Sequence, residues 1–129
     1  MVTLVIPGYS AHNKTWVEET AKNIKVEGQI RPIFWDHWTD SEKKFNAKEK
    51  AKILSNISPN IIINIIAKSL GTLVASHIIL NNPDAIGKVV LNGIPLNDIS
   101  EEDKGVIGKA LEALNNNNVI CIQNNIRCN

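Results

Sequence analysis

Short apolar runs alternate along the chain with longer segments in which apolar and polar residues mix at helical spacing. Runs that are rich in β-branched residues predict strands at residues 3–6, 30–34, 60–66, 87–92 and 119–123. The run at 60–66 is almost continuously apolar, which is typical of a strand that helices cover on both faces. The run at 30–34 contains Pro32, which cannot donate a ladder hydrogen bond. We therefore expect that strand at or near a sheet edge.

The segments between these runs predict four helices. They cover residues 15–26, 41–57 and 71–81, and the fourth begins near Ser100. Thr15 and Ser100 are each followed three residues later by an acidic residue, a spacing typical of a capping box. The first helix is expected to stop before Gly28, and the third before an Asn-Pro pair.

This alternation of strands and helices predicts an α/β fold with a doubly wound, mostly parallel sheet and helices on both faces. For five strands, right-handed crossovers make 2-1-3-4-5 the simplest strand order. In that order the loops after Ile6 and Ile66 flank one crevice, where ligands are expected. We expect one domain spanning residues 1–129.

Composition excludes several classes of function. Hydrophobic residues make up 43% of the chain and charged residues 21%, as in ordinary globular proteins. A net charge of +1 offers no surplus for nucleic acid or a membrane surface. No signal peptide or membrane span is evident, and Cys121 and Cys128 lack metal-ligand spacing. We expect a cytoplasmic protein without metal or cofactor.

The strongest chemical signal is the segment 67–71, Ala-Lys-Ser-Leu-Gly, between a predicted buried strand and a predicted helix. Its spacing is that of a nucleophile elbow, G-x-S-x-G, with Ala67 in the first glycine position. Such a turn strains the backbone of Ser69 and exposes its hydroxyl. The alternative is that Ser69 merely caps the helix, but the strand–turn–helix context favours the elbow.

The loop at the other lip of the crevice is Pro-Gly-Tyr-Ser, residues 7–10. With a nucleophile elbow, this loop supplies one backbone N–H of an oxyanion hole and the residue after the serine supplies the other. The two donors would be Tyr9 and Leu70, and Gly8 would let the backbone approach closely. Ser10 belongs to the same loop. An ordinary strand-to-helix turn explains the Pro-Gly pair equally well.

Three segments together resemble the small single-domain α/β-hydrolases, which are serine hydrolases with a compact sheet. They are residues 5–10, Val-Ile-Pro-Gly-Tyr-Ser; residues 35–38, Trp-Asp-His-Trp; and residues 67–71. The resemblance extends from residue 3 to residue 123. It implies a serine hydrolase that acts on a carboxylic ester or amide, with Ser69 as nucleophile.

The family pattern also requires an acid and a histidine after the serine, in that chain order. Residues 124–129 contain neither, so the domain is expected to be C-terminally incomplete and weak or inactive as an enzyme. His12 and His37 follow the first two strands, where either is a candidate for the missing base. The position of His37 between Trp35 and Trp38 is more typical of a residue that shapes the pocket or caps the fold. His77 lies too far along its helix to reach Ser69. Asp98, a candidate acid, is more simply a turn or cap residue.

Two hypotheses therefore stay open. The chain is either a serine hydrolase that takes a small acyl substrate, or a non-catalytic relative that binds a ligand or a partner protein. A flavodoxin-like binding domain is disfavoured, because the first loop lacks the Ser, Thr and Gly run that holds phosphate. The strand at 119–123 would leave an unpaired edge, through which a homodimer could form.

Overall fold

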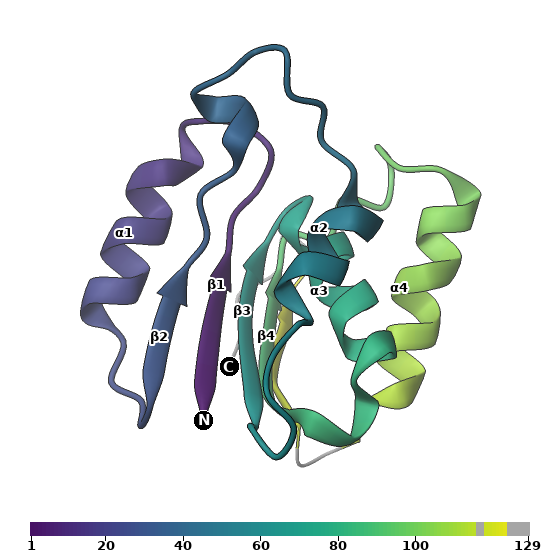
Figure 1. The fold of residues 1–129 in the computed structure, drawn as a ribbon. Helices are drawn as coiled ribbons and strands as arrows, with labels where there is room; N and C mark the ends of the chain where they lie inside the picture. Colours follow the sequence, from purple (N-terminus) through teal and green to yellow (C-terminus); the bar gives the residue numbers. More distant parts are fainter. Residues whose placement is uncertain (116–117, 124–129) are drawn as a thin grey trace.

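The computed structural model describes residues 1–115 and 118–123, and its centre is a parallel sheet (Figure 1). The strands are β1 (Val2–Ile6), β2 (Gln29–Pro32), β3 (Ile63–Lys68), β4 (Ile86–Asn92) and β5 (Val119–Gln123). Their order is β2-β1-β3-β4, and the backbone of β5 pairs in parallel with β4. The α/β class and the parallel sheet are confirmed. Pro32 lies in β2 at the sheet edge, as its missing N–H predicts.

Four α-helices connect the strands. They are α1 (Asn13–Asn23), α2 (Ala47–Leu54), α3 (Gly71–Asn81) and α4 (Glu101–Ala113), with short 3₁₀ helices η1 (Asp36–Trp38) and η2 (Pro83–Ala85). Figure 1 shows α1 beside β2, apart from α2, α3 and α4, which lie together. Right-handed crossovers explain this, because only the step from β1 to β2 runs in the opposite direction across the sheet.

Two of the predicted helices had wrong boundaries. α1 begins at Asn13 rather than at Thr15, and no side chain caps it. The reason is a turn in which the Asn13 backbone N–H donates to Ser10 O at 2.9 Å, so the chain is already helical before Thr15. α2 is shorter than predicted, because Asn46 caps it by accepting a hydrogen bond from the Glu49 N–H. The predicted Ser100 cap of α4 is confirmed.

The main hydrophobic core lies between the sheet and α2, α3 and α4. Alternate residues of the strands, such as Leu4, Ile65 and Leu91, point into it and are fully buried. α3 is buried along most of its length, as its apolar sequence requires. On the opposite face α1 buries Val17, and Val5 is fully buried there outside the main core. The two faces of the sheet are therefore unequally covered.

The strand register brings three loops together at one end of the sheet. Ile6 at the end of β1 pairs with Ala67, and Lys68 at the end of β3 pairs with Asn92 at the end of β4. The loops that follow these strands therefore start side by side, which is where ligands bind in open parallel sheets. Among the described residues, no helix is long and apolar enough to cross a membrane.

Candidate functional site

Ser69 has the strained backbone that was expected for the turn between β3 and α3. Its φ is +53°, a left-handed conformation that residues other than glycine rarely adopt. The Ser69 N–H donates to Asn92 O at 2.8 Å, and the Thr72 N–H and hydroxyl donate to Ser69 O at 2.9 and 2.7 Å. These bonds hold the strained residue between β3 and the first turn of α3, at a helix N-terminus that favours negative charge.

Small residues on either side make this turn possible. A Cβ atom at Gly71 would lie 2.5 Å from both Ile6 O and Pro7 O, so only glycine fits against the end of β1. Ala67, two residues before the serine, is fully buried beside β1. The sequence spacing that indicated an elbow therefore reflects a real close approach of α3 to the neighbouring strand.

The loop after β1 packs directly against the Ser69 side chain. A Cβ atom at Gly8 would lie 3.2 Å from the Ser69 Cβ, and the Gly8 N–H donates to the Asn13 side chain at 3.2 Å. Ser10 lies in the turn that starts α1, where its hydroxyl accepts the His12 N–H at 3.2 Å. The structure therefore brings Gly8 to the serine but gives Ser10 a role in the turn.

Ring N–H groups hold the carbonyls of this loop. Trp35 Nε1 donates to Gly8 O at 3.0 Å and to Pro7 O at 3.3 Å. Trp38 Nε1 and His37 Nε2 both lie 2.7 Å from Tyr9 O. Sequence reasoning placed His37 and Trp38 near the pocket but missed Trp35 as a site residue. Trp35 belongs to the sequence motif at 35–38 and lies one residue before η1. Membership of that motif is the sequence feature that could have identified it as a site residue.

The predicted oxyanion-hole donors are the backbone N–H groups of Tyr9 and Leu70. Among the described residues, no acceptor is found for the N–H of Tyr9 or of Leu70. Leu70 directly precedes α3, so its N–H belongs to the set that a helix N-terminus leaves unsatisfied. Backbone amides that have no acceptor in the described part of the chain are available to bind a negatively charged oxygen.

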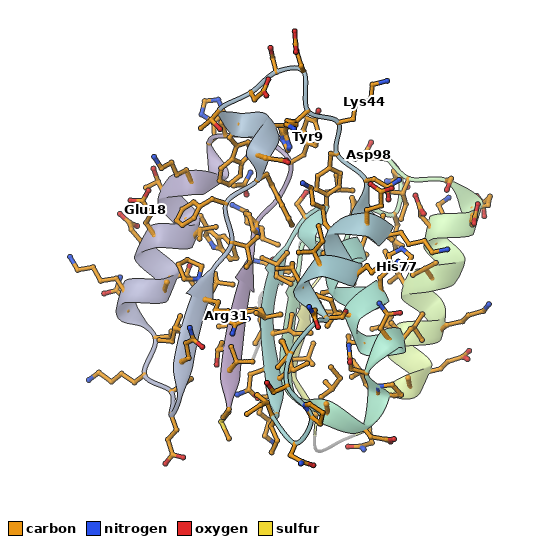
Figure 2. The ribbon with its side chains drawn as sticks, in the orientation of Figure 1. Tyr9, Glu18, Arg31, Lys44, His77 and Asp98 are labelled. Carbon is orange, nitrogen blue, oxygen red and sulfur yellow. The ribbon has the colours of Figure 1, made fainter. Side chains whose placement is uncertain are left out.

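A cavity of about 290 Å³ opens beside Ser69 on the side of β4. Its walls are Ser69, Gly93, Ile94, Pro95, Leu96, Asn97 and Asp98. Gly93 adopts φ +66° to begin this loop, which sequence reasoning described only as a turn. Asp98 is exposed and does not cap α4, because Ser100 does. In Figure 2, Asp98 and Tyr9 lie at the end of the molecule to which the strands point.

Neither candidate histidine near the first loop contacts Ser69. His12 is exposed at the start of α1, and no hydrogen bond joins Ser69 Oγ to a histidine within the described part of the chain. His37 stacks on the Tyr9 ring at 4.3 Å, and Tyr9 O can only accept, so Nε2 carries a proton. Its Nδ1 is buried and has no hydrogen-bond partner in the part of the chain that the structure describes. His37 therefore supports the loop through Tyr9 O, and no hydrogen bond from it to Ser69 is found among the described residues.

η1 is tied to α2 by an ion pair. Lys50 Nζ lies 2.7 Å from Asp36 Oδ1, and the hydrogen bond from this ammonium holds the pKa of the Asp36 carboxyl below its usual range. Phe45, just before α2, packs edge-on against both Trp35 and His37. These contacts fix the segment that carries the ring donors to the loop after β1.

His77 lies in the groove between α2 and α3 (Figure 2) and does not line the cavity beside Ser69. Burial lowers its pKa below the ordinary value of 6.5, and Lys48 acts in the same direction, while Asp103 opposes the shift. The unfolded chain therefore binds a proton at His77 more readily than the folded chain does. The contribution of His77 to stability is complete above pH 6.5 and is lost as pH falls toward the folded pKa.

We expect His77→Gln to flatten the acid limb of the stability curve. The wild-type free energy of unfolding should fall more steeply than that of the variant between about pH 7.5 and pH 5.5. Urea titrations at several pH values measure this difference. Because both proteins contain His12 and His37, the difference between the two curves reports on His77 alone. Parallel curves would show that His77 has the same pKa in the folded and unfolded chains.

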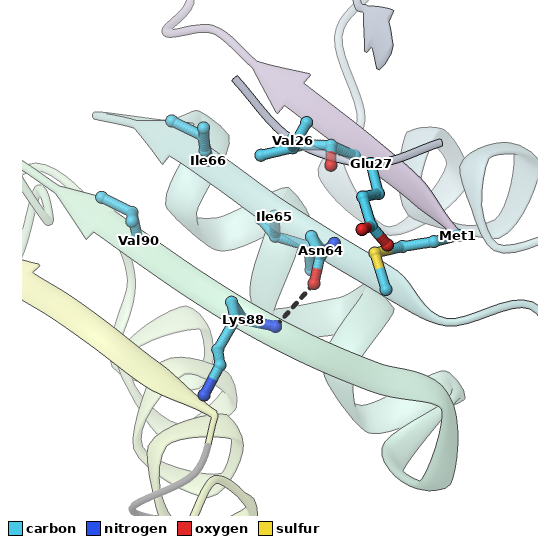
Figure 3. Close-up of a pocket in the computed structure, with 9 residues that line it drawn as sticks. Met1, Val26, Glu27, Asn64, Ile65, Ile66, Lys88 and Val90 are labelled. Carbon is cyan, nitrogen blue, oxygen red and sulfur yellow. Dashed lines mark hydrogen bonds between the residues drawn. The ribbon is translucent and has the colours of Figure 1, made fainter. Parts of the chain in front are cut away.

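A second cavity, also about 290 Å³, lies on the face of the sheet that carries α1, and Figure 3 shows the residues that line it. It is lined by Met1, Thr3, Val26, Glu27, Asn64, Ile65, Ile66, Lys88 and Val90. Asn64 Oδ1 accepts the Lys88 backbone N–H at 2.7 Å, and Thr3 Oγ1 is buried with no partner among residues 1–115 and 118–123. This cavity is mostly apolar and does not include Ser69, so it is separate from the candidate site.

No cluster of metal-ligating side chains is found among the residues that the structure describes. The arrangement at Ser69 therefore consists of a strained, half-buried serine, two backbone amides without an acceptor among the described residues, and a small cavity that Asp98 also lines. A search with protein-family models gives no match to this sequence, and a search of curated proteins finds no relative.

Proposed function

We propose that this chain is a serine hydrolase of the α/β-hydrolase type, with Ser69 as the nucleophile toward a carboxylic ester or amide. The observation that carries the proposal is the φ of +53° at Ser69, between a buried strand and a buried helix. A strained non-glycine residue is retained where the strain serves a purpose. Here the strain would hold the hydroxyl at the end of the sheet, against the loop after β1 that carries the Tyr9 amide.

The reaction would proceed through an acyl-enzyme. Ser69 Oγ forms a bond to the acyl carbon and loses its proton, while the carbonyl oxygen becomes an anion that the Tyr9 and Leu70 N–H groups bind. The bond to the leaving group then breaks, and the leaving group takes up a proton. Water attacks the acyl-enzyme, which releases the carboxylic acid and returns the proton to Ser69.

Turnover is expected to be slow. Within the described residues no histidine contacts Ser69, so the proton of Oγ would pass to water rather than to a positioned base. Loss of triad members lowers turnover by about 10⁴ to 10⁶ in serine hydrolases.

The lack of a hydrogen bond between Ser69 and a histidine, among the described residues, also favours a second candidate function. In this second function the site binds an acyl ligand without catalysis. Asp98 lines the same cavity as Ser69 and is a candidate for the acid.

Hydrolysis of p-nitrophenyl acetate tests this proposal. Surface histidines also cleave this ester, so the informative quantity is the difference between the wild type and Ser69→Ala. We expect Ser69→Ala to lower the rate to the background of the remaining side chains. Ser58→Ala, at an exposed serine before β3, is the matched control and should keep the wild-type rate. Equal rates for all three proteins would favour binding without catalysis.

A further inference from the structure

Trp35 contacts the loop after β1 from inside the fold. The residue is only 3% exposed, and its ring packs edge-on against Phe45 with the ring centres 5.2 Å apart. From this position Nε1 donates to Gly8 O at 3.0 Å and to Pro7 O at 3.3 Å. Because water is excluded here, loss of the donor would leave buried carbonyl oxygens without a partner.

The bond to Gly8 O fixes the direction of the next N–H. Gly8 C=O and Tyr9 N–H belong to one planar trans peptide, so they point in opposite directions. With the oxygen directed at Trp35, the Tyr9 N–H is directed away from Trp35. Ser69 lies against the same glycine, with its Cβ 3.2 Å from the position of a Cβ at Gly8.

We propose that Trp35 is a positioning residue, which through Gly8 O aims the Tyr9 N–H at an acyl oxygen bound to Ser69. The inference rests on the proposed function of Ser69 and extends it to a residue that does not touch the substrate. Trp35 differs in this from Trp38, which donates to Tyr9 O in the next peptide. Tyr9 O also accepts a hydrogen bond from His37, so Trp38 is one of two donors to that carbonyl. Among the described residues, Trp35 is the one donor to Gly8 O.

The test compares phenylalanine substitutions, which remove an indole N–H and retain an aromatic ring. Phosphonylation of Ser69 by a small fluorophosphonate is followed by intact mass, and kinact and KI are obtained separately. We expect Trp35→Phe to lower kinact about tenfold with KI unchanged, because one oxyanion donor is misdirected. Trp38→Phe should have a smaller effect. Trp16→Phe, on α1 over Lys68, is the control and should match the wild type.

Equal kinact for Trp35→Phe and the wild type would overturn the inference, and so would a loss confined to KI. If the wild type takes no adduct, the proposed function fails, and Trp35 is then judged from ¹⁵N relaxation of the Tyr9 amide. An order parameter near 0.85 in the wild type that falls below about 0.6 in Trp35→Phe supports the positioning role. An unchanged order parameter would overturn it without reference to catalysis.

Discussion

Gly71→Ala is expected to destabilise the protein by about 3 kcal/mol and to lower Tm by about 10 °C. The added methyl group would lie 2.5 Å from two backbone oxygens, Ile6 O and Pro7 O, which belong to a central strand and its buried end. A flexible side chain could move aside, but these atoms cannot move without disturbing β1. Urea unfolding followed by circular dichroism measures the loss.

Gly105→Ala is the matched control for that experiment. Gly105 lies inside α4, and a Cβ there would meet nothing within 4 Å. Replacement of a helical glycine by alanine at an open position should raise the free energy of unfolding by about 0.5–1 kcal/mol. The change in the free energy of unfolding is therefore expected to have opposite signs for Gly71→Ala and Gly105→Ala. Equal stability of Gly71→Ala and the wild type would mean that α3 does not approach β1 as closely as described.

Ser69→Gly is expected to make the protein more stable and to abolish acylation. A left-handed conformation costs a non-glycine residue about 1–2 kcal/mol, and glycine adopts it freely. After the larger entropy of glycine in the unfolded chain is subtracted, the gain should be about 1 kcal/mol. Ser69→Ala keeps a Cβ and the strain, so it should lose acylation without this gain.

Thermal unfolding of the three proteins in parallel measures this difference. A higher Tm for Ser69→Gly than for Ser69→Ala, with no acylation of either, is the expected combination. If glycine and alanine give the same Tm, the backbone at residue 69 is not strained, and the main support for a nucleophile elbow is removed.

Much of the sheet could be predicted from the sequence, because its signals are local. Runs of β-branched residues indicate the strands, and Pro32 indicates the sheet edge. On an edge strand a missing N–H need not remove a hydrogen bond between strands. The start of α1 could not be predicted, since it depends on hydrogen bonds within the turn at 10–13 that compete with the Thr15 cap. The length of α2 likewise depends on Asn46, which caps the helix. The surrounding segment is rich in charged residues throughout, so its sequence does not show where the helix begins.

The candidate site could be predicted in part. The spacing of Ala67, Ser69 and Gly71 indicated the strain at Ser69. A turn tight enough to strain the serine also requires small residues two positions before and after it, so the signal is local in sequence. The support of the other loop could not be predicted, since Trp35 reaches Gly8 across 27 positions of sequence. Nor could spacing show whether His12 or His37 faces the serine. His37 is used instead to bind Tyr9 O.

Intact-mass analysis after treatment with a fluorophosphonate tests the role of Ser69 most directly. We expect one adduct on the folded wild type and on Ser58→Ala, and none on Ser69→Ala. This result would show that Ser69 is a reactive nucleophile, which is the basis of the proposed function. No adduct on folded wild-type protein, or the same adduct on Ser69→Ala, would contradict it.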